Sequence, residues 1–141
     1  MWKAQIYQES RFKEDAVSPV GARGLSQIMP ATWDEIVRQL GIAAAASPFG
    51  ADEAIDLGAY YQGKQRRGWR AAGRSPTQRN ELGQASYNAG FGSILKAQKL
   101  CDDAVLWDDI APCLQNVTGE KNARETRGYV TSIRKWRRMM D

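Results

Sequence analysis

The sequence predicts a mainly α-helical protein with a single domain, and three observations support this fold class. The chain has 141 residues, 43% of them hydrophobic, which is enough to build one sizeable core. Helix start and stop signals are frequent, whereas strand-like alternation is weak. A charged fraction of 26%, with 13 glycines and 5 prolines, argues against a disordered or low-complexity chain. We therefore expect one globular domain over residues 1–141, without internal repeats.

The first expected helix covers residues 1–9, MWKAQIYQE, and makes about two and a half turns. Proline and glycines in residues 10–24 then end regular structure. Glu9 would lie at the C-terminal end of this helix, where the helix dipole and an apolar neighbour such as Phe12 both disfavour a charged carboxylate. A carboxyl group that stays partly protonated near neutral pH can act as a general acid. A glutamate at a helix end is nevertheless more often a solvated surface residue.

The second and third helices are expected from capping signals. TWDE has the Thr-x-x-Glu form of a capping box, so the second helix should begin at Thr32 and end near Gly41. Residues 41–50 are expected to form a connection that ends in a proline-containing turn. Asp52 is expected to cap the third helix, and small residues on one of its faces would let another helix approach closely. The members of that face are Ile55, Gly58, Ala59 and Gln62.

The second half of the chain repeats this logic. Ser75 and Gln78 form a second capping box, with Pro76 at the first helical position, where its missing N–H costs little. That helix should end at Gly90. Its inward side chains would be Leu82, Ala85, Ser86 and Ala89. In the C-terminal segment, apolar side chains recur at the period of an amphipathic helix. They are Tyr129, Ile133, Trp136 and Met140.

Composition excludes several kinds of chemistry. The chain contains no histidine, which excludes Ser-His-Asp and Cys-His catalysis and histidine-ligated metal sites. Cys101 and Cys113 alone cannot complete a zinc site. They form either a disulfide or two buried thiols, and the proline before Cys113 slightly favours the disulfide. The acidic run 101–109 lacks the spacing of a calcium loop. We therefore expect no metal and no cofactor.

The charge balance favours an anionic partner without choosing one. The net charge is +4 and the pI about 9.2, with positive charge concentrated in residues 64–70 and 134–138. Nucleic acid, anionic lipid and an anionic wall polymer all fit, and solvated basic helix faces fit equally well. No stretch approaches the roughly 18 to 20 apolar residues of a membrane span, and residues 1–10 lack the apolar region of a signal peptide.

Five segments, in order along the chain, resemble the catalytic domain of the soluble, family 1 lytic transglycosylases. They are ESRF (9–12), GARGLSQIMPATW (21–33), LGAYY (57–61), ASYNAG (85–90) and ETRGYV (125–130). The resemblance covers residues 6 to about 135. It implies a lysozyme-like fold and a cofactor-independent enzyme that cleaves peptidoglycan, the anionic polymer of bacterial cell walls.

The resemblance also implies roles for individual residues. Glu9 matches the catalytic acid, which protonates the glycosidic oxygen between N-acetylmuramic acid and N-acetylglucosamine. As a carboxylate it then takes the C6 hydroxyl proton, which leaves a 1,6-anhydromuramoyl end without using water. Asn88 as a helix cap and Tyr129 as a core residue remain plainer explanations, and Glu35 reads as a capping group. The matching substrate-binding positions are Ser10, Gln27, Tyr87, Asn88 and Tyr129.

The chain departs from the family pattern in three ways. Ser26 stands where the family motif has Met. Ala54 stands where the family often has Asn, so that one polar support would be missing or moved. The helix before Glu9 is also short, which favours a compact phage-type enzyme or an absent upstream part. We expect a phage endolysin or a virion-borne module. It would be made in the host cytoplasm without a signal peptide and would act as a monomer on peptidoglycan in the periplasm or cell wall. No nucleic acid and no stable membrane insertion are expected.

Two other functions remain open at this point. A goose-type lysozyme would use the same fold and acid, with water as the acceptor instead of the C6 hydroxyl. A non-catalytic helical domain would bind the wall or nucleic acid through the basic residues 134–138. The intact pair of Glu9 and Ser10 favours the transglycosylase.

Overall fold

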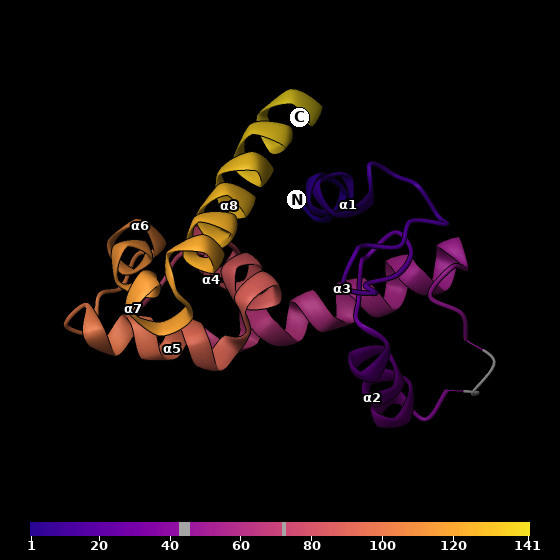
Figure 1. Cartoon of the computed structure of the whole chain (residues 1–141), viewed down its shortest axis with the longest axis horizontal. Coiled ribbons are helices and arrows are strands. Elements are labelled where there is room, and N and C mark those ends of the chain that lie inside the picture. Colours follow the sequence, from indigo (N-terminus) through magenta and orange to yellow (C-terminus); the bar gives the residue numbers. More distant parts are fainter. Residues whose placement is uncertain (43–45, 72) are drawn as a thin grey trace. The chain divides into compact units, whose positions relative to one another are not determined.

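The computed structural model describes residues 1–42, 46–71 and 73–141 (Figure 1). The described residues form helices and two isolated β-bridges, which confirms the mainly α prediction. Part of the expected connection 41–50, residues 43–45, lies outside them. The elements are α1 (Trp2–Ser10), α2 (Pro30–Leu40), α3 (Ala51–Gly68), α4 (Pro76–Ala89), α5 (Phe91–Leu100), α6 (Trp107–Ile110), the 3-10 helix η1 (Ala111–Leu114), α7 (Gln115–Thr118) and α8 (Glu120–Met140).

The chain divides into two compact units. The first contains Met1–Tyr61 and Trp136–Asp141, and the second contains Gln62–Lys135. The expectation of one domain over residues 1–141 stays a prediction. Within the described ranges, no helix is long and apolar enough to cross a bilayer.

The core of the first unit joins α1 to the following loop and to α3. Ile6, Leu25 and Ala54 are buried together, and Trp2 packs against them. The Trp2 indole Nε1 also donates to the carbonyl of Ile55 at 3.2 Å. The predicted first helix is confirmed, because α1 ends at Ser10 and carries Glu9 in its last turn.

The predicted capping box of α2 is wrong. The helix begins at Pro30, not at Thr32, and the backbone N–H of Trp33 donates to the carbonyl of Met29 at 2.9 Å. Proline suits the first helical position, since the N–H that it lacks would have no partner there. Thr32 therefore lies inside the first turn.

Glu35 does not cap α2 either. It lies within the helix, where its carboxylate accepts a hydrogen bond of 2.6 Å from the Gln39 side chain one turn later. The end of the helix is confirmed, because it closes at Leu40 before Gly41, which has a left-handed φ of 63°.

The buried face of α3 differs from the predicted one. Ala54 and Leu57 are buried together with Gly58, whereas Ile55 is 38% exposed and Ala59 is exposed. The prediction placed Ile55, Gly58, Ala59 and Gln62 on one face by their spacing; of these, Gly58 is buried and Gln62 is half-buried. The buried face is centred on Ala54, Leu57 and Gly58 instead, because Trp2 and Ser26 lie close to α3 at Gly58.

The prediction that Asp52 caps α3 is also wrong. The helix begins at Ala51, and the N–H of Ala54 already donates to the carbonyl of Gly50 at 2.9 Å. Asp52 lies in the first turn together with Glu53. Their negative charges are favourable there because the helix dipole is positive at its N-terminus.

In the second unit, α4 begins and ends where the sequence predicts. Ser75 Oγ accepts from the Gln78 N–H at 3.3 Å, and Gln78 Oε1 accepts from the Ser75 N–H at 2.8 Å. Pro76 is the first helical residue, and the helix ends at Ala89 before Gly90. The predicted inward residues Leu82, Ala85 and Ser86 are buried, and Ala89 is half-buried.

The core of the second unit surrounds α5, which packs against α4, α6, η1 and α7 (Figure 1). Ile94 and Leu114 are fully buried in this core. The Trp69 indole donates to Ser86 Oγ at 2.9 Å. Cys101 and Cys113 form a disulfide with a Cα–Cα distance of 5.9 Å, which answers the question left open by the sequence. It joins the end of α5 to η1.

The predicted C-terminal helix is confirmed as α8. Tyr129 and Ile133 are buried, and the Arg134 guanidinium donates to Glu81 at 2.8 Å and to Asp108 at 2.9 Å. The hydrogen bond with Glu81 is the main reason that the pKa of Arg134 is raised. The other two predicted apolar positions, Trp136 and Met140, are half-buried.

Gly24 gives a sharp test of the loop between α1 and α2. Its φ is +71°, and an added Cβ would overlap the carbonyl oxygen of Pro48. We expect Gly24→Ala to lower the free energy of unfolding by more than about 3 kcal/mol, because strain and displaced backbone add. Gly21 is the matched control: its φ is +92° but a Cβ would meet nothing within 4 Å, so Gly21→Ala should cost only about 1 to 2 kcal/mol. Equal losses in denaturant unfolding would contradict the close approach.

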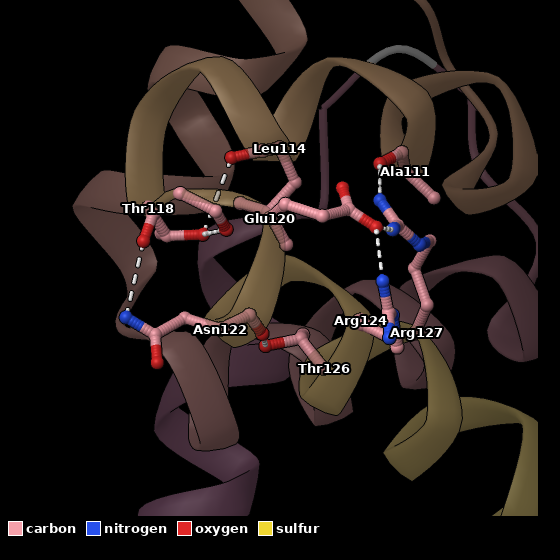
Figure 2. Close-up of polar contacts among 9 residues, drawn as sticks. Ala111, Leu114, Thr118, Glu120, Asn122, Arg124, Thr126 and Arg127 are labelled. Carbon is pink, nitrogen blue, oxygen red and sulfur yellow. Dashed lines mark hydrogen bonds and ion pairs between the residues drawn. The ribbon is translucent and has the colours of Figure 1, made fainter.

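Glu120 gives a pH-dependent test of α8. Its carboxylate accepts from Arg127 at 3.0 Å and from Arg124 at 3.4 Å (Figure 2). The hydrogen bond from Arg127 is the main cause that lowers the pKa of Glu120. A carboxyl with a lowered pKa stabilises the fold above its unfolded-state pKa, and this contribution is lost as pH falls through the folded-state pKa. The contribution to stability is small, since the pair is exposed.

We expect NMR titration of the Glu120 carboxyl to give a midpoint below that of a free glutamate side chain. Arg127→Gln should raise this midpoint, and the control Arg124→Gln should raise it less, because its contact is longer. A midpoint unchanged by Arg127→Gln would show that this hydrogen bond does not form in solution.

Candidate active site

Glu9 lies directly before an unusual turn. It is half-buried in the last turn of α1, and Arg11 caps that helix by donating its N–H to the carbonyl of Tyr7 at 3.0 Å. Arg11 has a φ of 55° and Phe12 a φ of 62°. Left-handed conformations of residues other than glycine cost about 1 to 3 kcal/mol each and persist only where surrounding contacts hold them. The second and third residues after Glu9 therefore hold strained backbone conformations.

Ser10, the next predicted site residue, is buried. Only 5% of its surface is exposed, and its Oγ donates to the carbonyl of Ile6 at 3.3 Å. This contact satisfies the buried hydroxyl within α1 itself. The position suits a residue that steadies the turn beside Glu9.

Gln27 closes the loop that follows. Its φ is 47°, and its amide Nε2 donates to the carbonyl of Ala16 at 3.1 Å and to that of Gly24 at 2.9 Å. Both amide hydrogens are thereby used. Among the described residues, Oε1 has no hydrogen-bond donor. The half-buried side chain therefore presents a fixed acceptor of the kind that binds a sugar hydroxyl.

Two of the residues that depart from the family pattern, Ser26 and Ala54, contact each other. Ser26 is 1% exposed and its Oγ donates to the carbonyl of Ala54, which is also 1% exposed. A Cβ on Gly58 would overlap Ser26 Oγ and would lie 2.6 Å from Trp2 Cζ2. The hydroxyl thus supplies a polar contact between the loop and α3. The expectation that a polar support is missing or moved at Ala54 stays a prediction.

In the second unit, Asn88 is held by α8. Its Oδ1 accepts from Thr126 Oγ1 at 2.7 Å, and α4 ends at Gly90. Asn88 is therefore not the helix cap that was its plainer explanation. It lines an open pocket of about 200 Å³. The lining residues are Asn88, Ala89, Thr118, Asn122, Glu125 and Thr126.

Glu125 is the carboxylate of this pocket, and it was not predicted as a site residue from the sequence. The ETRGYV segment contained the signal, but only Tyr129 was taken from it. Polar groups of Thr118, Asn122 and Thr126 lie along the same side of α7 and α8, and the Asn122 amide donates to the carbonyl of Thr118 at 3.0 Å (Figure 2). The pocket thus combines a carboxylate with amide and hydroxyl groups.

The remaining predicted residues also lie in the second unit. Tyr87 is half-buried on α4, and Tyr129 is 6% exposed on α8. Glu9, Ser10 and Gln27 belong to the first unit, and Tyr87, Asn88 and Tyr129 belong to the second. In the described part of the chain, no group of three or more cysteine or carboxylate side chains could hold a metal ion.

Comparison with known proteins assigns the sequence to a family. The sequence model of the transglycosylase SLT domain matches residues 1–107. Membrane-bound lytic murein transglycosylase F of Shewanella halifaxensis is 31% identical over 148 residues, which cover 94% of this chain and 29% of that protein. The protein of the same name from Serratia proteamaculans is 32% identical, with 96% of this chain and 30% of that protein covered.

Two solved structures share the fold. The lytic transglycosylase Slt of Pseudomonas aeruginosa superposes with a TM-score of 0.75 at 31% identity, and covers 96% of this chain and 20% of its own. The 70 kDa soluble lytic transglycosylase of Escherichia coli has a TM-score of 0.76 at 25% identity, with the same coverage. The chain spans less than a third of each of these relatives. The lysozyme-like fold is thereby confirmed, and the chain belongs to the transglycosylase SLT domain family.

Proposed function

We propose that this chain is a peptidoglycan lytic transglycosylase, that residues 1–141 form its catalytic domain, and that Glu9 is its acid. The observation that carries the proposal is the place of Glu9. It matches the family's acid in sequence, it is half-buried at the end of α1, and the costly turn at Arg11 and Phe12 fixes the chain directly after it. Residues that hold such strain cluster at functional sites.

The proposed reaction uses one carboxyl group twice. Protonated Glu9 donates its proton to the oxygen that links N-acetylmuramic acid to N-acetylglucosamine, and the bond from that oxygen to C1 breaks. The substrate's N-acetyl carbonyl stabilises the positive charge at C1. The C6 hydroxyl of the same sugar then attacks C1 and gives its proton to the Glu9 carboxylate. This step restores the acid and leaves a 1,6-anhydro ring without consuming water.

An internal nucleophile explains why one acid is sufficient. Well-oriented intramolecular groups reach effective concentrations of about 10⁵ to 10⁸ M, far above that of water. Most glycosidases that use water or a protein nucleophile have a second carboxylate at a fixed distance. The nearby Glu14 and Asp15 are both exposed and read as loop charge.

We assign sugar binding to polar side chains whose positions are fixed by hydrogen bonds, such as those of Gln27 and Asn88. Gln27 offers its Oε1 beside the loop, while Asn88 and Glu125 line the pocket of the second unit. Ser10 would steady the acid. Tyr87 and Tyr129 would add hydroxyl groups and flat apolar faces, which suit sugar rings. The substrate is the glycan strand of peptidoglycan, and no cofactor takes part.

Because the proposed substrate is peptidoglycan, we expect the enzyme to act in the periplasm or cell wall. A monomer needs no further partner for the proposed reaction, and this state stays a prediction. The role of a phage endolysin also stays a prediction. The relatives named above come from bacteria, and those of Shewanella and Serratia are named membrane-bound enzymes.

Glu9→Gln tests the acid. We expect it to abolish the release of fragments from purified sacculi while leaving thermal unfolding nearly unchanged, because the amide keeps the shape and loses the transferable proton. Glu14→Gln, at an exposed loop position, is the matched control and should retain activity. Mass analysis of wild-type products should find 1,6-anhydro ends. Reducing ends instead would assign the chain to goose-type hydrolysis, and full activity of Glu9→Gln would reject the mechanism.

Salt tests the role of the basic surface. Positive charge raises the encounter rate with an anionic polymer, and salt screens it over a Debye length of about 10 Å at 0.1 M. We expect the initial rate of wall digestion to fall as salt is added. Arg70→Gln, at an exposed position, should lower the rate at low salt and not at high salt. A rate independent of salt would contradict electrostatic attraction.

A further inference from the structure

The C-terminal end of α8 contacts the turn that carries Glu9. The Trp136 ring lies edge-on to the Tyr7 ring, with centroids 4.9 Å apart and an interplanar angle of 81°. Its indole Nε1 donates to Gln8 Oε1 at 2.8 Å. Trp136–Asp141 belong to the same compact unit as α1, so these contacts lie within one unit.

Arg11 completes this cluster. Its guanidinium carbon lies 4.5 Å from the centroid of the Tyr7 ring and 4.8 Å from that of Trp136. Both distances are within the range of cation–π attraction. Phe12 adds an aromatic contact to Tyr7 at 5.3 Å. Arg11 and Phe12 are the two residues with positive φ after α1, so the side chains that hold the turn belong to the residues that form it.

The contacts surround Glu9 along the chain. Gln8 lies directly before it, and Tyr7 and Arg11 lie two residues away on either side. Trp136 contacts the side chains of all three residues, which lie on both sides of the proposed acid in the chain. We propose that Trp136 is a positioning residue for Glu9 and that it acts through Arg11. The proposal rests on the proposed function for the role of Glu9.

Trp136 is not one of the buried core residues of the first unit. Trp136 is half-buried, whereas the core residues Ile6 and Leu25 of the same unit are 5% and 6% exposed. Its neighbour Met139, one turn along α8, is 69% exposed. The matching family model ends at residue 107, so this contribution lies outside the part of the chain that it describes.

Paired substitutions separate positioning from stability. Trp136→Leu removes the ring, and Trp136→Phe keeps a ring while losing the hydrogen bond to Gln8. Arg11→Met removes the cation, and Arg11→Lys keeps it. Met139→Leu is the control on the exposed face of the same helix. For each variant, kcat and KM are measured on soluble peptidoglycan strands, together with the thermal midpoint.

We expect Trp136→Leu and Arg11→Met to lower kcat by about 10- to 100-fold with KM little changed, since small displacements of a catalytic group act on the chemical step. Trp136→Phe and Arg11→Lys should retain most of the wild-type kcat. Met139→Leu should match the wild type. Full kcat in folded Trp136→Leu, or KM rising as much as kcat falls, would overturn the positioning role.

Hydrogen exchange tests the clamp without using activity. The Arg11 amide donates to Tyr7, and it should exchange faster in Trp136→Leu than in the wild type or Met139→Leu. Unchanged exchange in Trp136→Leu would overturn the clamp. A wild-type protein that releases no anhydro ends would instead overturn the proposed function, so the two failures are distinguishable.

Discussion

The loop between α1 and α2 depends on one close approach of backbone to backbone. Gly24 packs against the carbonyl of Pro48, where any side chain would collide. This approach fixes the Gly24 carbonyl, which accepts from the amide of Gln27, and the same amide reaches the carbonyl of Ala16. The direction of Gln27 is therefore set by backbone groups. A loop built in this way can present a polar group as rigidly as a helix does.

The sequence predicts best those elements whose signals are local. The limits of α4 follow from Ser75, Pro76 and Gly90, because the chemistry of each lies within a few residues of the boundary. The start of α2 was misplaced since Pro30 competes with the Thr32 capping box, and the first helical position suits proline better. Such a competition is decided by the path of the preceding loop, which no short pattern encodes.

The buried face of α3 could not be derived from hydrophobicity. Ile55 and Leu57 are similar in size and hydrophobicity, yet Ile55 is exposed, while Leu57 is buried with Ala54 and Gly58. The choice is made by Trp2 and Ser26, which come from segments far away in the chain and need the space beside Gly58. Hydrophobic size predicts burial only where the partner surface has room for it.

In the candidate site, too, residues within a local sequence motif were predicted, whereas residues that act through contacts distant in the chain were not. Glu9 and Gln27 follow from motifs, since their neighbours in sequence carry the pattern. Trp136 does not, because its contacts with Arg11 join residues at opposite ends of the chain. Asn88 was selected, but its partner Thr126 was not, for the same reason.

In a reaction that uses one carboxyl group for both proton transfers, the position of that group must be set accurately relative to both oxygens of the substrate. With an internal hydroxyl as nucleophile, the substrate carries its own geometry, and the protein has no water to place. Three residues other than glycine have positive φ in this part of the chain: Arg11 and Phe12 follow the proposed acid, and Gln27 closes the loop between α1 and α2. The other two described residues of this kind, Asp102 and Asp103, follow α5. The aromatic and cationic contacts of Trp136 reach Tyr7 and Arg11 on either side of Glu9. In its proposed role, the C-terminal end of α8 therefore supports the proposed chemistry at Glu9.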